Sequence, residues 1–401
     1  MLYAPVAEWL ESIPRQASAT KYPRPSHSVR RLPAIDSARG AAMVLVCLAH
    51  FASKYVAPAG GDAAGVWLRF ASHMASPMFF IISGSMVGYL YTSRPDAFAR
   101  VRASLARRAI FLLTIGHVLI LGAHARRLAD LTGSARMLFV TDTIAIALLV
   151  TPRLMRMPAR WRLLGAAAVY ATSCALVYLW DPQQLDLRVL KDTLMGIDGD
   201  TFWAYNVPVL PWLAVHAAGT VLGVKLAESL TSGGRGRIET KLASMGGGLV
   251  ALSLVLRRAL LFVASNGKIS DPRAAYAIRQ LASPWQRVPP SPVHLLLFGG
   301  LALIAISAVF SFEALGVFPR LLAWCGVLGR TSAFVFILQF YVFYLAIPVL
   351  VPLRLVLAPF VFLGAMLLIG ECARIWMQQR SRFARSTWVI SPTTVVPASK
   401  G

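Results

Sequence analysis

The feature that most constrains this chain is a series of long apolar segments separated by short basic ones. A helix needs about 20 apolar residues to cross the hydrocarbon core of a bilayer. Ten segments approach that length, and we expect each to form a transmembrane helix: 40–57, 74–92, 107–124, 137–151, 161–180, 204–224, 244–264, 292–312, 331–350 and 353–371. The fourth segment is short, and the seventh contains Arg257 and Arg258, so these two depart most from the expected pattern.

The composition agrees with a polytopic membrane protein. Hydrophobic residues make up 57% of the chain and charged residues 14%, with a mean hydropathy of +0.62. Soluble domains average roughly 25% charged residues, and a soluble chain could not bury this much apolar surface. This excludes a soluble enzyme, a disulfide-rich secreted protein and a disordered chain. We therefore expect an all-α bundle of about ten transmembrane helices, 35–372, between a cytoplasmic segment, 1–34, and a basic cytoplasmic tail, 373–401.

The distribution of charge predicts the orientation. The net charge is +23, but the Lys and Arg residues occupy short blocks between apolar segments, which is unlike a nucleic-acid-binding surface. If the N-terminus is cytoplasmic, the cytoplasmic segments carry more than twice as many Lys and Arg residues as the opposite loops. The positive-inside rule then places both termini in the cytoplasm. We expect a multi-pass inner-membrane protein whose partner is the bilayer, with no nucleic-acid partner and with a homodimer as a candidate assembly.

Several common cofactor motifs do not occur in the sequence. The four cysteines, Cys47, Cys174, Cys325 and Cys372, form no CxxC pair, and there is no HExxH. Neither a metal site nor a disulfide framework is therefore expected. No GxxxxGK[ST] or GxGxxG is present, which leaves ATP-driven transport and dinucleotide chemistry without support.

The first apolar segment contains the sharpest set of ionisable residues. Asp36 and Arg39 precede the apolar run, and His50 lies eleven residues after Arg39. In a helix this spacing puts Arg39 and His50 on one face, about 16 Å apart along the axis; Asp36 and Lys54 extend the same face. A histidine in such a position can act as a general base near neutral pH. The alternative is a buried histidine that is hydrogen-bonded to a neighbouring helix.

Other polar or small residues within the apolar segments invite simpler interpretations. Gly84 and Gly88 form a GxxxG motif, which allows two helices to approach closely. Asp142 requires a partner or water, and a structural pair and a substrate contact are equally open. For His117 and His216 we expect packing or hydrogen bonding.

Six segments resemble one family, in the order in which that family carries them. They read RLPAIDSARGAAMVLVCLAHF, ASPMFFIISGSMVGYL, NVPVLPWLAVHAAGTVLG, LRRALLFVASNGKISDP, QRVPPSPVHLLLFGG and LGRTSAFVFILQFYVFY, and they span residues 31–345. The first resembles the opening of the transmembrane acyltransferases, with its Arg-x10-His spacing. Together they are similar to heparan-α-glucosaminide N-acetyltransferase and its bacterial relatives.

This resemblance implies a membrane enzyme that moves an acyl group, most simply acetyl, from acyl-CoA on the cytoplasmic side to a sugar or another hydroxyl or amine acceptor. His50 would be the catalytic base or acyl carrier, and Asp36 and Arg39 would position it or the donor. The cationic residues Arg39, Arg107 and Arg108 at the cytoplasmic mouth would attract the phosphates of acyl-CoA.

Further residues match family positions or could contact substrate. The candidate substrate-binding residues are Asp142, Arg257, Ser291 and Gln339, while Pro289 and Pro290 match motif positions without an assigned role. The sequence departs from relatives at Arg287 and Val288, where Lys and Tyr are usual, and at Gln339, where a histidine is usual. Gln cannot take up a proton.

Two further hypotheses belong to other classes of protein. A transporter or flippase would use His50, Asp142 and Arg257 to line a permeation path. A non-catalytic membrane scaffold would be consistent with the loss of the histidine at Gln339. Transfer or hydrolysis of acyl-CoA in detergent would distinguish the enzyme from both.

Overall fold

The computed structural model describes residues 32–55, 68, 70–124, 136–196, 207–231, 235–265, 271–346 and 357–389, and one compact unit contains all of them. The described residues are predominantly helical and contain no β-strand beyond one isolated bridge, Arg287 with Pro290. The predicted all-α membrane fold is thus confirmed. Residues 1–31, which make up most of the predicted N-terminal segment, lie outside the described part.

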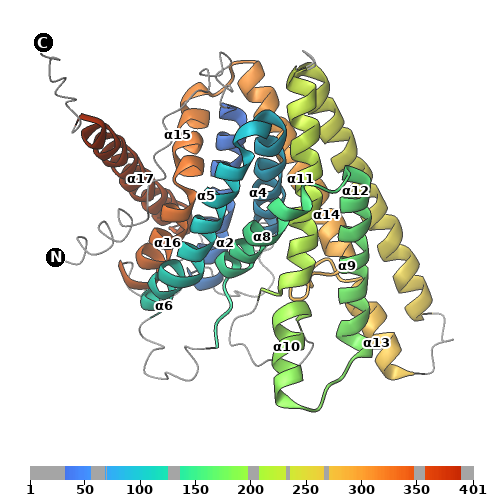
Figure 1. Cartoon of the computed structure of the whole chain (residues 1–401). Helices are drawn as coiled ribbons and strands as arrows, with labels where there is room; N and C mark the ends of the chain where they lie inside the picture. The colour runs from blue at the N-terminus through green and yellow to red at the C-terminus, as the bar shows by residue number, and fades with distance from the viewer. Residues whose placement is uncertain are drawn as a thin grey trace, which may run out of the picture. The chain divides into compact units, whose positions relative to one another are not determined.

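The α-helices follow one another along the chain (Figure 1). Their bounds are α2 (Pro33–Tyr55), α4 (Ala75–Ser93), α5 (Phe98–Phe111), α6 (His117–Ala123), α8 (Val140–Leu154), α9 (Ala159–Leu179), α10 (Leu185–Met195), α11 (Val209–Thr231), α12 (Arg235–Ser265), α13 (Pro272–Leu281), α14 (Pro292–Ala314), α15 (Pro319–Arg330), α16 (Ser332–Tyr341) and α17 (Ala358–Val389). A 3-10 turn, η1 (Pro95–Ala97), precedes α5, and two π-helical turns, η2 (Leu112–Gly116) and η4 (Val342–Ala346), follow α5 and α16.

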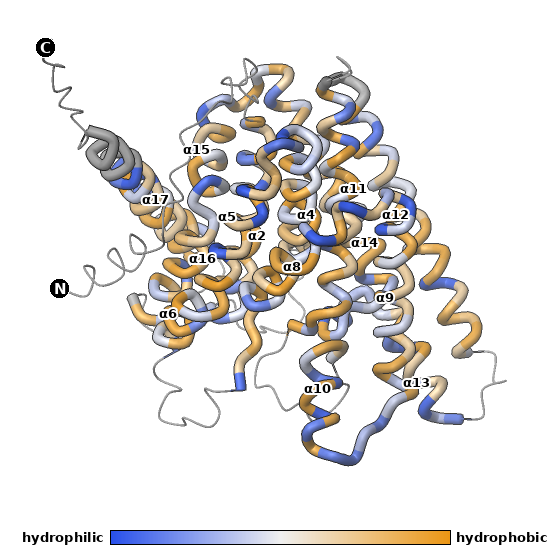
Figure 2. Tube along the Cα trace, in the orientation of Figure 1, coloured by the Kyte–Doolittle hydropathy of each residue, from blue (hydrophilic) through white to orange (hydrophobic). Residues whose placement is uncertain are grey.

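Eight of the ten predicted transmembrane segments correspond to helices that are long and apolar enough to span a membrane. Figure 2 shows hydrophobic residues running along these helices, with hydrophilic residues toward many of their ends. The fourth predicted segment forms α8, whose 15 residues fall short of a full span. The ninth lies in α16, which joins α15 at a bend of 86°, and this pair forms a broken span or a re-entrant loop. Helix α17 continues past residue 372, the last residue of the predicted transmembrane domain, into the predicted tail.

The predicted GxxxG motif produces a close helix–helix contact. A Cβ atom on Gly84 would lie 2.0 Å from the carbonyl oxygen of His216, and one on Gly88 would lie 1.9 Å from that of Thr220. Gly223 of α11 faces the backbone of α4 equally closely. Because a glycine lies on one side of each of these contacts, the backbones of α4 and α11 approach closely, and theirs is the most extensive helix pairing among the described elements.

A second close contact fixes the position of α2. A Cβ atom on Gly40 would lie 1.8 Å from the carbonyl oxygen of Cys325, and one on Gly329 would lie 1.9 Å from that of Asp36. The Ser37 hydroxyl also donates a hydrogen bond to the Leu322 carbonyl at 2.9 Å. The first turns of α2 are therefore held firmly against α15.

Candidate active site

Helix α2 presents Arg39 and His50 toward the interior of the bundle, as their spacing predicts. Arg39 is half-buried, and its Nη1 lies 3.4 Å from the Gly329 carbonyl oxygen on α15. His50 is half-buried near the other end of the helix. Each residue lines a separate cavity. We call these the Arg39 cavity and the His50 cavity.

The His50 cavity has a volume of about 220 Å³. Aromatic rings form much of its wall, and the His50 ring lies 4.8 Å from the Phe340 ring and 6.4 Å from the Phe336 ring, measured between centroids. Its polar lining consists of His50, Ser53, Ser72, Ser76, His124, Arg287 and Tyr344. Within the described residues the His50 ring nitrogens form no hydrogen bond, so the structure does not show the helix-to-helix bond that the simpler interpretation of this histidine required.

The Arg39 cavity is smaller, about 130 Å³, and its lining is more cationic. Arg39 and Arg108 line it together with three hydroxyl-bearing residues, Ser83, Thr141 and Ser332. Thr141 and Ser332 are only 4% and 1% exposed, and neither hydroxyl has a hydrogen-bond partner among the described residues. A buried polar group without a partner costs about 1–3 kcal/mol. Their position therefore suits a ligand or water that supplies the missing bonds.

Phe79 and Phe336 line both cavities. They come from α4 and α16, both of which contact α2. The two cavities are therefore neighbours along α2, with these phenyl rings at the boundary. The rise of an α-helix gives about 16 Å between the levels of Arg39 and His50.

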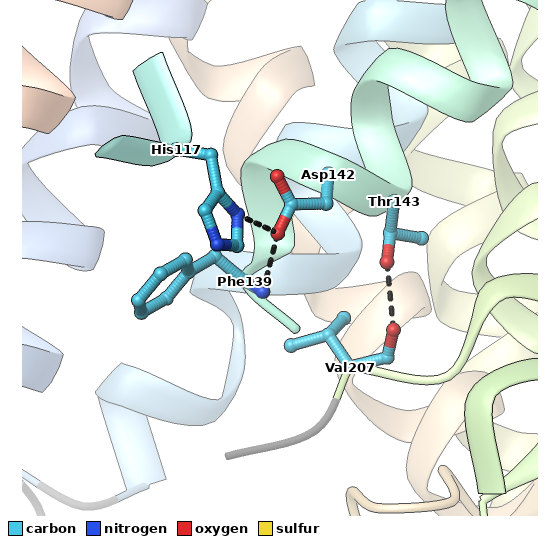
Figure 3. Close-up of polar contacts among 5 residues, drawn as sticks. All are labelled: His117, Phe139, Asp142, Thr143 and Val207. Carbon is cyan, nitrogen blue, oxygen red and sulfur yellow. Dashed lines mark hydrogen bonds and ion pairs between the residues drawn. The ribbon is translucent and has the colours of Figure 1, made fainter. Parts of the chain in front are cut away.

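Asp142 forms a structural pair rather than lining either cavity. Its Oδ2 accepts hydrogen bonds from His117 Nδ1 at 2.9 Å and from the Phe139 backbone N–H at 2.8 Å (Figure 3). The second bond caps the N-terminus of α8. Thr143, one residue further, donates to the Val207 carbonyl at 2.6 Å. These bonds fix the start of α8, where Phe139 borders the His50 cavity.

His216 is fully buried in α11, and its Nε2 lies 3.1 Å from the Ser83 hydroxyl, which lines the Arg39 cavity. His117 and His216 thus both have the hydrogen-bonding roles that the sequence indicated.

The remaining candidate residues are not among those that line the two cavities. Asp36 is buried at the contact between α2 and α15, whereas Arg107 is exposed on α5. Arg257 is exposed on α12, a helix with few buried residues. Ser291 is the N-cap of α14, where its hydroxyl accepts from the His294 N–H at 2.9 Å and donates to the Ser283 carbonyl at 2.6 Å.

Gln339 is completely buried in α16, and its two amide atoms have no hydrogen-bond partner among the described residues. It is absent from the residues that line the His50 cavity. Gln339 is also absent from the lining of the Arg39 cavity, so it contributes to the surface of neither cavity.

Sequence reasoning missed two lining residues, His124 and Arg287. His124 is the last residue of the predicted segment 107–124 and is separated by one alanine from Arg126 and Arg127, so in the sequence it resembles a residue at a membrane interface. Arg287 stood out only as a departure from the relatives' lysine. Within the described part of the chain, no three His, Cys, Asp or Glu side chains converge as a metal site would require.

The fold and the cavities define a polytopic helical membrane protein with a histidine exposed to an internal cavity. The comparison with known families is specific: the model for the catalytic domain of heparan-alpha-glucosaminide N-acetyltransferase matches residues 31–262, more than half of the chain. The chain belongs to this family of membrane acetyltransferases, which confirms the resemblance seen in its motifs. No curated relative matches the sequence.

Proposed function

We propose that the protein transfers an acetyl group from acetyl-CoA, bound from the cytoplasmic side, to a sugar acceptor that reaches His50 from the opposite side of an inner membrane. The observation that carries this proposal is the placement of Arg39 and His50 in two adjoining cavities on one face of α2. Family membership supports the reaction class, and the geometry supports the assignment of the two substrates to the two cavities.

The Arg39 cavity suits the donor. Arg39 and Arg108 provide positive charge for the phosphates of the coenzyme, since a guanidinium forms charge-assisted hydrogen bonds with phosphate oxygens. The unpartnered hydroxyls of Thr141 and Ser332 can bind amide groups along the pantetheine arm. An extended arm can cover the 16 Å or so from the level of Arg39 to that of His50.

The His50 cavity suits the reaction itself. The His50 imidazole, which has no hydrogen-bond partner among the described residues, can use its lone pair to deprotonate an acceptor hydroxyl or amine, or to attack the thioester and carry the acetyl group. The aromatic rings in its lining would limit the access of water to the reacting groups and so slow hydrolysis relative to transfer. Serine hydroxyls at positions 53, 72 and 76 can hydrogen-bond a sugar.

The geometry favours transfer over transport. A permeation path through His50, Asp142 and Arg257 requires these residues to line one passage. Asp142 instead pairs with His117 outside both cavity linings, and Arg257 is exposed on α12.

The experiment uses the purified protein in nanodiscs with radiolabelled acetyl-CoA and glucosamine as the probe acceptor. We expect CoA release and acetylated product from the wild type, and neither from His50→Ala. A wild type that releases no CoA and acetylates nothing, yet supports proton-coupled uptake in liposomes, would favour the transporter.

A further inference from the structure

We infer that His124 is a second catalytic histidine, the base that accepts the acceptor's proton while His50 carries the acetyl group. This inference rests on the proposed function. It extends that function by assigning the two halves of the reaction to two different imidazoles in one cavity.

The first observation is the position of His124. It directly follows α6 and lines the His50 cavity. Its ring lies 5.3 Å from the Phe340 ring, which is itself 4.8 Å from the His50 ring, measured between centroids. The two imidazole centroids are therefore separated by no more than the sum of these distances. An acceptor group between them can reach both.

The second observation is the tautomer that the surroundings impose. His124 Nδ1 lies 2.9 Å from the Ile120 carbonyl oxygen. A carbonyl oxygen can only accept a hydrogen bond, so Nδ1 must carry the proton. In the neutral ring the lone pair is consequently on Nε2. The backbone thus prepares His124 as a base.

The third observation concerns the helix that carries it. His117 and His124 are two helical turns apart and share a face of α6, and both rings pack against Phe139, with centroids 5.2 Å and 5.7 Å away. The bond from His117 to Asp142 anchors this face to α8. One histidine of the pair thus holds the helix, and the other borders the cavity.

The chemistry requires a second base if His50 becomes acylated. The titratable groups that line the cavity are His50, His124, Arg287 and Tyr344, and Lys54 lies 4.3 Å above the Tyr344 ring. An arginine cannot accept a proton, and a tyrosine hydroxyl titrates near pH 10. No carboxylate occurs among the lining residues that the structure describes. Among these residues, His124 is therefore the group that is suited to accept a proton near neutral pH while His50 carries the acyl group.

The atoms and charges balance in two steps. In the first, a ring nitrogen of His50 forms a bond to the thioester carbonyl carbon, and the coenzyme leaves as a thiolate, so that His50 is an N-acetylimidazolium. In the second, the acceptor oxygen or nitrogen bonds to that carbon, the carbon–imidazole bond breaks, and His50 leaves as neutral imidazole. The acceptor's proton moves to His124 Nε2 and is then released to water.

The test separates the two steps. His124→Asn retains a side-chain N–H close to the position of Nδ1, which can still donate to Ile120, but it cannot accept a proton. We expect the first release of CoA, one equivalent per enzyme, to keep its wild-type rate. Steady-state acetylation of glucosamine should fall by about 10²–10⁴-fold, and intact-mass spectrometry should show acetyl-His50 accumulating.

A matched control is His117→Asn, which changes the other histidine on the same face of α6. It should not accumulate acetyl-His50, whatever its effect on stability. Turnover with water as the only acceptor, measured in parallel, keeps the test valid if glucosamine is not acetylated. In the wild type, the rate of transfer should fall at low pH as His124 becomes protonated, and this fall should be absent in His124→Asn. A merely structural role of His124 would not remove it.

Two results for His124→Asn would overturn the inference while leaving the proposed function intact. In one, the initial release of CoA slows as much as acetyl transfer does. In the other, acetyl transfer slows but the acetylated enzyme does not accumulate. By contrast, a wild type that never releases CoA from acetyl-CoA would disprove the proposed function itself.

Discussion

Arg39 and His50 lie on the same face of α2, yet they line two different cavities that adjoin at Phe79 and Phe336. Because α2 is fixed against α15 through Gly40 and Gly329, their relative positions are set by the helix itself. One straight element therefore carries both a cationic group and a basic imidazole. The predictions below follow from this arrangement and from the contacts that support it.

Replacing His50 by Ala should lower acetyl transfer by about 10²–10⁴-fold without unfolding the protein, because the imidazole is the proposed base or acyl carrier and is half-buried. Initial-rate assays and size-exclusion chromatography check both parts. His216→Ala, which removes a histidine bonded to Ser83 outside the His50 cavity, should have a far smaller effect on the rate. Turnover at the wild-type rate in the His50 variant would refute the mechanism.

The sequence predicts the same role for Arg107 and Arg108, but the structure places them differently relative to the Arg39 cavity. Arg108 lines the Arg39 cavity, whereas Arg107 does not. Loss of one charge-assisted hydrogen bond costs about 1.5–3 kcal/mol. Arg108→Ala should therefore raise the KM for acetyl-CoA by about 10–100-fold, with the KM for the acceptor unchanged. Arg107→Ala is the matched control, and equal effects from both variants would mean that general surface charge attracts the donor.

Asp142→Ala should destabilise the protein by about 1–3 kcal/mol, because it leaves His117 Nδ1 and the Phe139 N–H without their partner. Asp142→Asn keeps an oxygen acceptor and should cost less. Thermal unfolding followed by tryptophan fluorescence measures the difference. If either variant changed the acceptor KM while the midpoint of unfolding stayed constant, Asp142 would instead be a substrate contact.

Gly84→Ala should disrupt the contact between α4 and α11, because the new methyl group would lie 2.0 Å from the His216 carbonyl oxygen. Overpacking of this kind costs about 1–3 kcal/mol. Gly165→Ala on α9 is the control, since a Cβ atom there has no neighbour within 4 Å. The midpoint of thermal unfolding should fall for Gly84→Ala only.

The distribution of Lys and Arg residues predicts that both termini are cytoplasmic, and fusions to a reporter can test this orientation. A periplasm-active reporter fused after residue 401 should stay inactive, whereas one inserted near Asp192 should be active. Activity from the C-terminal fusion would show that the number of membrane crossings is odd. This result would also bear on α8 and on the bent pair α15–α16, the two elements that depart from a simple span.

The sequence was sufficient for the helical class, for most spans and for the shared face of Arg39 and His50, since these depend on local hydropathy and helical periodicity. It could not supply contacts between distant segments. The partner of Asp142 comes from α6, and the Ser291 hydroxyl donates to the carbonyl of Ser283 across a turn.

His124 illustrates the limit most clearly. The π-helical turn η2 lies between α5 and α6 and inserts an additional residue into one helical turn. This shifts the faces of α6 relative to those of α5, and no hydropathy pattern records the shift. The residue that borders the His50 cavity therefore becomes evident only from the folded backbone.

The position of Phe79 and Phe336 between the two cavities has a consequence for the electrochemical gradient across the membrane. If the pantetheine arm fills the passage at Phe79 and Phe336 while the acetyl group is transferred, no continuous column of water needs to connect the two sides of the membrane. Ions and protons then gain no route along the path that the acetyl group follows. Under the proposed function, a cell can modify sugars beyond its membrane without spending its electrochemical gradient on leakage.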